Sequence, residues 1–430
     1  MSQTITTRRD LEAHQLVKLR QLLAALVPGN AFYTHKLNGA GVTADIFSIR
    51  AFAEQMPFTL KQELVDDQAV HPPYGTNLTY PPSRYTKLHQ TSGTTHQPLR
   101  WLDTLEDWNW MVDHWVQAYR AAGIDASDRI AFAFSFGPFL GFWTAFDAAE
   151  KIGCLTLPGG GLTSIARLHM MVDNGATVLC CTPTYAMRLI EIAKDQAIGP
   201  SQMALKAIFV AGEPGGCLPA FRTRMESAWP NAHVFDQHGM TEVGPVTYQT
   251  PERPDTLTFM ERSYLAEVID PESREPVLRG QIGELVLTTL GRVGSPLLRY
   301  RTGDLVRAVE IDDTRVGYPC LGLEGGIIGR NDDMVCVRGM NIYPTAIDQI
   351  VRSCNGIGEY RVEVQSSRSM TELNILIEPD RDRSDVVDLG PRLENELRAA
   401  LAIRIPVRVV ARGSLPQFEM KAKRWIKMDE

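Results

Sequence analysis

Apolar runs alternate with amphipathic stretches in the middle of the chain, and this pattern limits the fold more than any other feature. ATVLCCTP (176–183) precedes TYAMRLIEIAKDQ, and KAIFVAG (206–212) precedes CLPAFRTRMESAW. Short apolar runs suit buried strands, and the stretches that follow them suit helices. The alternation predicts βαβ units and a largely parallel sheet. In such sheets ligands bind where strands end and helices begin.

The pattern changes towards the C-terminus. From about residue 260, shorter strand-like pieces with turns predict a small β-rich subdomain. After a turn at Arg330 to Asp333, helix-like and strand-like stretches end in the strand-like VRVVAR (407–412) and predict a small α+β unit of domain size. We therefore predict an α/β protein with two domains. Residues 1–330 form a large N-terminal domain with mostly parallel sheets and the β-rich subdomain, and residues 331–430 form a small mobile α+β domain.

Charge and patterning argue against several functions. With 44 Lys and Arg against 51 Asp and Glu, the net charge of -7 gives no general attraction to nucleic acid or to an anionic membrane. The uncharged stretch Ile130–Phe146 approaches a membrane-spanning length, yet its early alternation and the Gly137-Pro138 break predict a buried strand, a loop and a helix. The N-terminus lacks a signal-peptide pattern and the seven cysteines lack metal-binding spacing, so we expect a reduced, cytoplasmic protein.

The stretch TSGTTHQPLRW (91–101) concentrates small hydroxyl residues around one glycine. Hydroxyls and backbone amides on such a turn can wrap phosphate oxygens, because small residues let the backbone approach. The signature G-x-x-x-x-G-K-[ST] is not met, since Gln97 follows His96 and no second glycine is present. An ATPase of that type is disfavoured, and a simple surface turn is the alternative.

Further stretches follow this loop in a definite order: AGEPGG (211–216), DQHGMTEVGP (236–245), YRTGDL (300–305), GRNDDMVCVRGMNIYP (329–344) and KAKR (421–424). Together they resemble the adenylate-forming acyl-CoA synthetase superfamily, most closely its phenylacetate-CoA ligase branch. NAFYTHKLNGAGV and MPFTLKQEL near the N-terminus extend the resemblance over nearly the whole chain. Each motif alone is weak, and the ordered set is strong.

The resemblance implies a two-step reaction. A carboxylate joins the α-phosphate of ATP and releases pyrophosphate, and the acyl group then passes from acyl-AMP to the thiol of coenzyme A. Because an anionic carboxylate attacks an anionic phosphate, positive charge and hydrogen-bond donors are the main catalytic need. The implied ligands are ATP, Mg²⁺, coenzyme A and a small aromatic carboxylic acid.

One cation of the phosphate loop is missing. Related sequences often carry a lysine at the position of Gln97. Mg²⁺ also neutralises phosphate oxygens, and His96 or Arg100 is a candidate to compensate; the alternative is that neither contacts phosphate. The residues implied to hold the β- and γ-phosphates are Ser92, Gly93, Thr94 and Thr95.

Two further motifs imply contacts to the metal and the nucleotide. Glu242 is implied as the Mg²⁺ ligand and Thr241 as a donor to the α-phosphate; the alternative is a helix start capped by Thr241. Asp304 is implied to accept hydrogen bonds from both ribose hydroxyls, and Arg330 to reach ribose or phosphate. A tight turn is the alternative for the T-G-D of YRTGDL.

AGEP is implied to form part of the adenine and acyl site. Gly212 lets the backbone come close, and Glu213 and Pro214 shape the wall; alternatively Glu213 is structural only. The DQHGM stretch adds the other residues implied at the nucleotide, which are Asp236, Gln237 and His238.

The small domain contributes a lysine and a hinge. Lys421 matches the lysine that bridges the carboxylate and the α-phosphate in the first step, and Lys423 is the alternative. Asp332 lies at the joint where the family's small domain is thought to rotate between the two steps. An inert linker is the alternative for Asp332.

Three phenylalanines predict the substrate class. Phe134, Phe136 and Phe139 would give flat apolar walls that suit an aryl or arylacetic acid such as phenylacetate, and the alternative is that they are core residues. The other residues implied around the acyl group are Ala211, Gly212, His238, Gly239, Met240 and Pro245.

His238 departs from the superfamily, which usually has Tyr at this position. A histidine can donate or accept a hydrogen bond and titrates near neutral pH. We hypothesise that His238 lies near the acyl carboxylate and favours a ring with an ortho amino or hydroxyl group, such as an anthranilate-like benzoate.

Rival functions stay open. The acyl-adenylate can be passed to a carrier-protein thiol or an amine, although the lack of a fused carrier domain favours free coenzyme A. Alternatively the missing lysine marks a non-catalytic nucleotide-binding regulator, against which Glu242, Asp304 and Lys421 argue. The family's habit predicts a homodimer.

Overall fold

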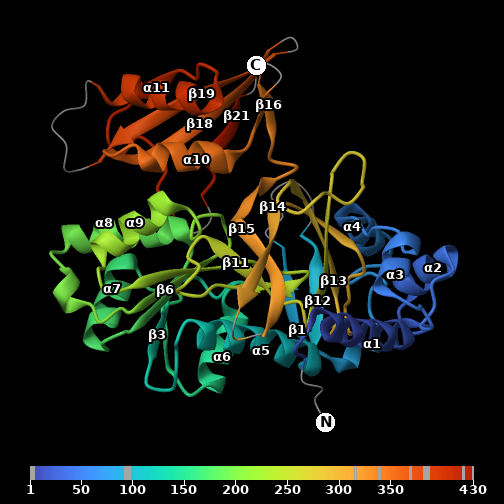
Figure 1. Ribbon diagram of the computed structural model, residues 1–430. Coiled ribbons are helices and arrows are strands. Elements are labelled where there is room, and N and C mark those ends of the chain that lie inside the picture. The colour runs from blue at the N-terminus through green and yellow to red at the C-terminus, as the bar shows by residue number, and fades with distance from the viewer. Residues whose placement is uncertain are drawn as a thin grey trace.

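Two bodies of different size make up the chain (Figure 1). The smaller body, drawn in orange to red, lies above the larger one and contains the C-terminal segments. The computed structural model describes residues 5–91, 98–313, 315, 317–337, 340–367, 370–380, 388–418 and 422–428.

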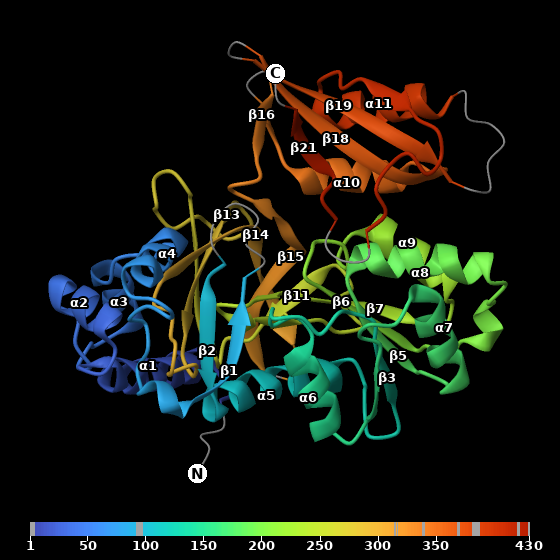
Figure 2. The same cartoon turned by 180° about the vertical axis from the view of Figure 1, so that it is seen from behind.

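A five-stranded parallel sheet with the order β4-β3-β5-β6-β7 lies in the larger body. Its strands are β3 (Arg129–Phe132), β4 (Leu155–Pro158), β5 (Val178–Cys181), β6 (Ala207–Ala211) and β7 (His233–Gln237). Its covering helices are α5 (Leu105–Ala121), α6 (Trp143–Lys151), α7 (Ser164–Asp173), α8 (Pro183–Asp195) and α9 (Pro219–Ala228). Figures 1 and 2 show α5 and α6 below the sheet and α8 and α9 above it. The predicted βαβ alternation is confirmed, because β5 leads into α8 and β6 into α9.

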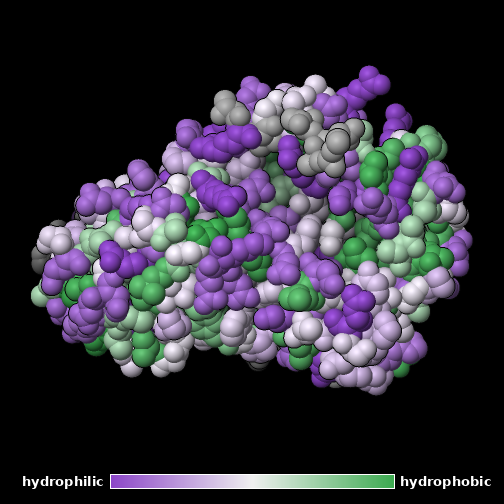
Figure 3. Space-filling model, turned by 90° about the horizontal axis from the view of Figure 1, so that it is seen from below, coloured by the Kyte–Doolittle hydropathy of each residue, from purple (hydrophilic) through white to green (hydrophobic). Residues whose placement is uncertain are grey.

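The uncharged stretch at 130–146 forms β3, a loop and the start of α6, as the Gly-Pro break predicts. In the part of the chain that the structure describes, no helix combines the length and apolarity needed to cross a lipid bilayer. On the face seen from below in Figure 3, hydrophobic residues form small patches among hydrophilic ones.

Both faces of the parallel sheet are covered by helices, which explains why the central strands β5 and β6 are apolar at every position. Successive side chains on a strand point to opposite faces. Phe132, Cys180 and Phe209 therefore pack with residues of α5 and α6. Leu179 and Val210 pack instead with residues of α7, α8 and α9.

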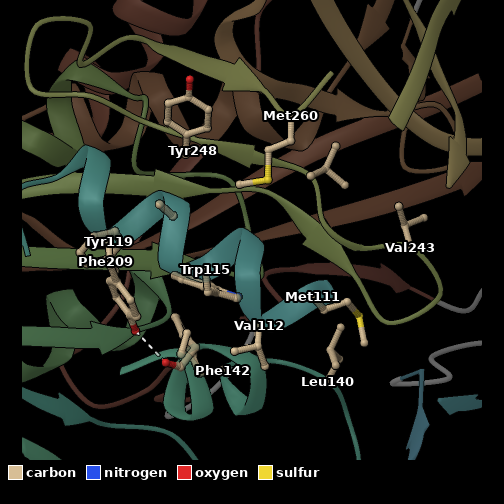
Figure 4. Packing of buried hydrophobic residues seen from close by; sticks show 14 of the residues in the cluster. Met111, Val112, Trp115, Tyr119, Leu140, Phe142, Phe209, Val243, Tyr248 and Met260 are labelled. Carbon is tan, nitrogen blue, oxygen red and sulfur yellow. Dashed lines mark hydrogen bonds between the residues drawn. The ribbon is translucent and has the colours of Figure 1, made fainter. Parts of the chain in front are cut away.

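An apolar stripe on α5 covers the lower face of this sheet. Figure 4 shows Met111, Val112 and Trp115 on the side of α5 that faces Leu140 and Phe142. These side chains repeat at helical spacing, so α5 buries one continuous face.

A six-stranded antiparallel sheet with the order β10-β11-β15-β14-β13-β12 lies beside the parallel sheet. Its strands are β10 (Thr247–Tyr248), β11 (Thr256–Phe259), β12 (Tyr264–Ile269), β13 (Ile282–Thr289), β14 (Tyr300–Asp313) and β15 (Tyr318–Arg330). The β-rich subdomain predicted from the sequence is therefore present, and its strands are antiparallel. The last strand, β15, leads towards the small body.

The described residues up to Thr104 pack around the antiparallel sheet. They contain α1 (Arg8–Leu26), α2 (Ala31–Ala40), α3 (Ile49–Gln55), α4 (Lys61–Val70), β1 (Tyr85–Gln90) and β2 (Arg100–Thr104). Side chains cap the first three helices, because Thr7, Asn30 and Ser48 each accept a hydrogen bond from the first turn. The antiparallel pair β1–β2 lies against α5 and brackets residues 92–97 (Figure 2).

The small body has its own core and a four-stranded sheet with the order β20-β19-β18-β21. Its elements are β16 (Val335–Val337), β17 (Met340–Ile342), α10 (Pro344–Ser353), β18 (Ile357–Ser367), β19 (Met370–Pro379), α11 (Leu389–Leu401), β20 (Val407–Val409) and β21 (Trp425–Met428). Ile347, Val362, Ile375 and Leu393 are fully buried between the helices and the sheet.

The prediction that VRVVAR forms the final strand is wrong. A later strand, β21, pairs in parallel with β18, placing Trp425 beside Val362. Four residues carry too little periodicity to be recognised alone, and the partner strand lies more than fifty residues earlier in the sequence. Pairing with β18 ties residues 425–428 to the small body.

Acid is expected to destabilise the fold through two buried histidines. Burial lowers the pKa of His89 to about 4 and that of His114 to about 3. Below pH 6.5 the unfolded chain binds protons at both residues while the folded chain does not, so the free energy of unfolding falls as the pH drops. Each histidine contributes about 1.4 kcal/mol per pH unit. Burial raises the pKa of Asp236 to about 6, which opposes one histidine between pH 6 and 3.8.

Urea unfolding at pH 7, 6 and 5 checks this prediction. His114→Gln keeps an amide beside Ser263, whose hydroxyl lies 2.6 Å from His114 Nε2, and removes the titrating ring. We expect this variant to lose stability with acid less steeply than the wild type. Equal slopes for the two proteins would contradict the prediction.

Candidate active site

The antiparallel sheet brings YRTGDL and GRNDDM together. In the β14–β15 register Asp304 lies opposite Arg330, and Arg330 Nη1 donates to Asp304 Oδ1 at 2.9 Å. The same guanidinium donates to Asp332, from Nε to Oδ1 at 2.9 Å and from Nη2 to Oδ2 at 3.1 Å. Arg330 therefore links the predicted ribose ligand to the predicted hinge.

Gly303 leaves room for this arginine. Its φ is 77°, and a Cβ at this position would lie 2.9 Å from Arg330 Nη2. Burial lowers the pKa of Arg330, but the carboxylates of Asp304 and Asp332 raise it more strongly, so its pKa lies above the ordinary value. The guanidinium stays charged and can meet an anionic ligand.

His238 faces the same carboxylate. Its Nε2 lies 3.3 Å from Asp304 Oδ2, its side chain is 11% exposed, and its backbone N–H donates to Thr247 Oγ1 at 3.0 Å. The imidazole thus lies beside Asp304, the residue predicted to bind the ribose. Its influence on an ortho substituent of the acid stays a prediction.

Glu242 lies in a hairpin, not at the start of a helix. The hairpin pairs β8 (Gly239–Met240) with β9 (Gly244–Pro245), so the alternative in which Thr241 caps a helix is wrong. The Glu242 side chain is only 6% exposed, and its Oε1 accepts from the Tyr300 hydroxyl at 2.9 Å. A tight turn between two-residue strands therefore presents this carboxylate beside the start of β14.

Lys61 is a site residue that the sequence analysis missed. It is the first residue of α4, and its Nζ lies 3.6 Å from Glu242 Oε1. Thr59 joins the edge of β14 by exchanging backbone hydrogen bonds with Arg299 and Arg301, at 2.9 and 3.0 Å. The backbone pairing places Lys61 beside Glu242. The sequence contains one indication of this role, which is that Lys61 lies in MPFTLKQEL, a stretch that resembles the family. The local sequence does not show which segment α4 contacts.

Arg292 supports the hairpin formed by β8 and β9. It is fully buried, forms a bidentate pair with Asp103 at 2.6 and 2.8 Å, and donates from Nη1 to the Thr241 carbonyl at 2.9 Å. A buried guanidinium that is fully paired holds a backbone in one place. Arg292 thereby positions the loop that carries Thr241 and Glu242.

Two residues predicted to contact the nucleotide form hydrogen bonds with backbone groups of the protein. Asp236 is buried, and its Oδ2 accepts from the Cys217 backbone at 3.0 Å, which ties β7 to the loop after AGEP. Gln237 donates from Nε2 to the His238 carbonyl at 2.7 Å. Their contact with a nucleotide stays a prediction.

Glu213 bonds to two distant backbones. Its Oε1 accepts from the Thr184 N–H at 2.7 Å, and its Oε2 accepts from the Ala422 N–H at 3.2 Å. Gly212, which precedes it, has a φ of 95° and follows the last residue of β6. Glu213 therefore connects the edge of the parallel sheet to the small body.

The predicted acyl-pocket phenylalanines lie beyond the end of β3. The rings of Phe134 and Phe136 are tilted by 36° with 4.3 Å between their centroids, and the ring of Phe136 lies 4.8 Å from that of Trp143. Phe134 is buried in the core, while Phe136 and Phe139 are half-buried. Met240 and Ala211 pack against the same core as Phe134. An apolar, aromatic wall therefore lies in the core against which Met240 and Ala211 pack, and contact with an acid stays a prediction.

Several predicted residues lie outside the described residues. They are Ser92, Gly93, Thr94 and Thr95 of the phosphate loop, with Gln97, and Lys421 near the C-terminus. Pro214 is exposed and Pro245 is buried in β9.

The residues around Glu242 fit a magnesium ion. Mg²⁺ in nucleotide sites is usually held by one or two carboxylates together with substrate phosphates. Tyr300 and Lys61 both approach Oε1 of Glu242 and orient the carboxylate. A single nearly buried carboxylate next to a cation suits an ion that arrives with a triphosphate.

Comparison with known proteins defines the class. A family model described as "AMP-binding enzyme" matches residues 81–291, and one described as "AMP-binding enzyme C-terminal domain" matches residues 339–428. The two matches fall in the larger and the smaller body. The chain therefore belongs to the AMP-binding enzymes, the adenylate-forming acyl-CoA synthetase superfamily.

Within this superfamily the similarity is to phenylacetate-CoA ligases. The chain is 28% identical over 421 residues to the phenylacetate-coenzyme A ligase of Pseudomonas putida, covering 96% of this chain and 93% of that protein. It is also 28% identical over 428 residues to the Escherichia coli (strain K12) enzyme of the same name, covering 96% and 94%. The resemblance seen in the sequence is confirmed at full length.

Solved structures also indicate the domain arrangement. The fold matches 2-hydroxyisobutyryl-CoA ligase in its postadenylation state with a TM-score of 0.92 at 28% identity, covering 98% of this chain and 90% of that chain. The same ligase in its thioesterification state gives 0.73 at the same identity and coverage. Since one protein is compared twice, the difference lies in how its parts are arranged. The arrangement of the two bodies described here matches the postadenylation complex of that ligase more closely than its thioesterification complex.

Proposed function

We propose that this chain is an ATP-dependent ligase that joins an aromatic carboxylic acid to coenzyme A through an acyl-AMP intermediate. One observation carries the proposal: Glu242 and Asp304, from two separate family motifs, converge on β14. Glu242 meets the strand through a hydrogen bond from Tyr300. Asp304 lies on the strand and faces Arg330 of β15 and His238. A predicted metal-binding carboxylate beside the start of β14 and a predicted ribose-binding carboxylate on that strand suit a nucleoside triphosphate.

The first step needs charge compensation above all. A carboxylate oxygen of the acid attacks the α-phosphorus, and the bond to pyrophosphate breaks. Mg²⁺, when bound, neutralises charge on the phosphate oxygens. Glu242 would hold the metal ion and Asp304 would bind the ribose hydroxyls. Arg330 and Lys421 would supply positive charge.

The second step uses the acyl-AMP as a mixed anhydride. The thiol sulfur of coenzyme A bonds to the acyl carbon, AMP leaves with the bonding electrons, and the thiol proton is released. The relatives named for phenylacetate and the aromatic wall at Phe134 and Phe136 support an aryl or arylacetic acid. The ligand set is ATP, Mg²⁺, coenzyme A and this acid.

We predict that Lys61 supplies part of the charge that Gln97 does not. Its side chain is about half exposed and reaches Glu242, so it can also reach a phosphate bound there. Lys61→Met is expected to lower kcat/KM for ATP by about tenfold, mainly through KM, because one charge is lost at the phosphates. Lys61→Arg should retain most of the activity. Steady-state kinetics in ATP test this, and an unchanged KM in Lys61→Met would contradict it.

Acid-dependent pyrophosphate release, with and without coenzyme A, tests the function. The panel contains phenylacetate, benzoate and their ortho-amino and ortho-hydroxy forms. We expect one aromatic acid to give turnover that needs coenzyme A and yields a thioester. Turnover that needs a carrier-protein thiol or an amine would replace coenzyme A in the proposal. Equal rates with all ring substituents would remove the proposed role of His238.

A further inference from the structure

A hydrogen-bonded contact between the two bodies lies directly beside Lys421. Ala422, the residue after Lys421, donates its N–H to Glu213 Oε2 at 3.2 Å. The other carboxylate oxygen of Glu213 accepts from Thr184 in the first turn of α8 at 2.7 Å. One carboxylate thus joins the AGEP loop, α8 and the terminal segment.

Arg424 completes the contact from the small body. Its Nε and Nη2 pair with Glu359 of β18 at 2.6 and 3.0 Å, which fixes the guanidinium. The remaining Nη1 donates to Thr184 Oγ1 at 3.2 Å. The Arg424 side chain is 10% exposed, and Thr184 is 5% exposed. Two nearly buried polar side chains therefore meet across the boundary, where an unpaired group would be costly.

We propose that Glu213, Thr184 and Arg424 are positioning residues that dock the terminal segment for acyl-AMP formation only. This inference rests on the proposed function. Glu213 fixes the backbone next to Lys421, and Arg424 fixes the chain two residues further on, so together they limit where the lysine can reach. The contact belongs to the arrangement that matches the postadenylation state. A rotation of the small body removes it, so thioester formation should not depend on it.

Glu213 must be a carboxylate because both of its oxygens act as hydrogen-bond acceptors. A carboxylate can accept from two N–H groups at once, whereas a glutamine amide offers one acceptor and two donors. Glu213→Gln can therefore keep the bond to the Thr184 N–H and must present a donor to the Ala422 N–H. Thr184→Val is the matched change on the other side, since it keeps the shape and removes the acceptor for Arg424.

Measuring the two half-reactions separately tests the proposal. Exchange of pyrophosphate into ATP reports the first step, and thioester formation from synthetic aryl-AMP and coenzyme A reports the second. We expect Glu213→Gln and Thr184→Val to lower exchange by about tenfold to a hundredfold, since small misplacements of a catalytic group have such effects. For Thr184→Val, which lies outside the predicted adenine and acyl site, thioester formation should stay within about twofold of the wild type, on the same argument.

Arg224→Ala is the control. Arg224 crosses the same boundary to Asp380 at 3.4 Å and lies in neither motif, so its removal should leave both steps near wild type. Equal losses in both steps for Thr184→Val would show a merely structural role and overturn the proposal. Unchanged exchange would overturn it as well.

Hydrogen exchange followed by mass spectrometry separates this inference from the proposed function. The peptide that contains Ala422 should exchange faster in Glu213→Gln than in the wild type and in Arg224→Ala. If the wild type shows no pyrophosphate exchange with any acid but this protection depends on Glu213, the docking contact stands and the ligase function fails. Protection that is the same in all three proteins overturns the docking contact itself.

Discussion

Glu242→Gln is expected to abolish most acyl-AMP formation, with pyrophosphate exchange falling by about a hundredfold or more. Gln is nearly isosteric and keeps an oxygen for the Tyr300 hydroxyl, which donates at 2.9 Å in the wild type. Only the negative charge is removed. A hard cation prefers anionic oxygen ligands, so the loss should appear as a higher Mg²⁺ requirement and a lower maximal rate. Exchange measured over a range of Mg²⁺ concentrations tests this.

Tyr300→Phe provides the matched control for Glu242. It removes the hydrogen bond to Glu242 and keeps the carboxylate charge, so the loss of exchange should be about tenfold, the low end for a partner that orients a metal ligand. A Glu242→Gln enzyme with wild-type exchange and Mg²⁺ dependence would show that this carboxylate holds no metal. A larger effect from Tyr300→Phe than from Glu242→Gln would show that the hydroxyl matters more than the charge.

Lys421→Ala is expected to have a comparable effect that is confined to the first step. We expect Lys421 to stabilise charge between the carboxylate and the α-phosphate, and removing such a group costs about 10² to 10³ in rate. Thioester formation from synthetic aryl-AMP should remain, because this step no longer joins two anions. Pyrophosphate exchange and thioester formation, measured on one preparation, test the prediction.

Neighbouring lysines serve as controls for Lys421. Lys423→Ala and Lys427→Ala remove the same charge within a few residues, and both should keep exchange close to the wild type. If Lys423→Ala loses exchange and Lys421→Ala does not, the catalytic position moves to Lys423. A loss of both half-reactions in Lys421→Ala would contradict the separation of the two steps.

The parallel sheet could be predicted from sequence because burial on both faces leaves a local signature. β5 is apolar at every position and α8 follows it with a helical pattern, so each segment carries its own evidence. The order of family motifs likewise fixed the class of protein. The strand β21 escaped prediction because its identity depends on pairing with β18.

The contacts within the site could not be predicted in the same way. Lys61 and Glu242 are far apart in sequence, and their pairing depends on the backbone bonds of Thr59 at the edge of β14. The sequence around Arg292 resembles an ordinary turn and does not indicate that this arginine is buried and paired with Asp103. The partner of the second carboxylate oxygen of Glu213 is the Ala422 N–H, and this contact depends on how the two bodies are arranged. Long-range packing and domain arrangement leave little trace in a single sequence.

Exchange of labelled pyrophosphate into ATP, measured with and without an aromatic acid, tests the central claim most directly. The account predicts exchange that requires the acid and Mg²⁺, does not require coenzyme A, and collapses in Glu242→Gln. ATP binding without exchange for any acid in the panel would contradict it. In that case the chain binds the nucleotide without activating a carboxylate, and the missing lysine at Gln97 marks a regulator rather than a ligase.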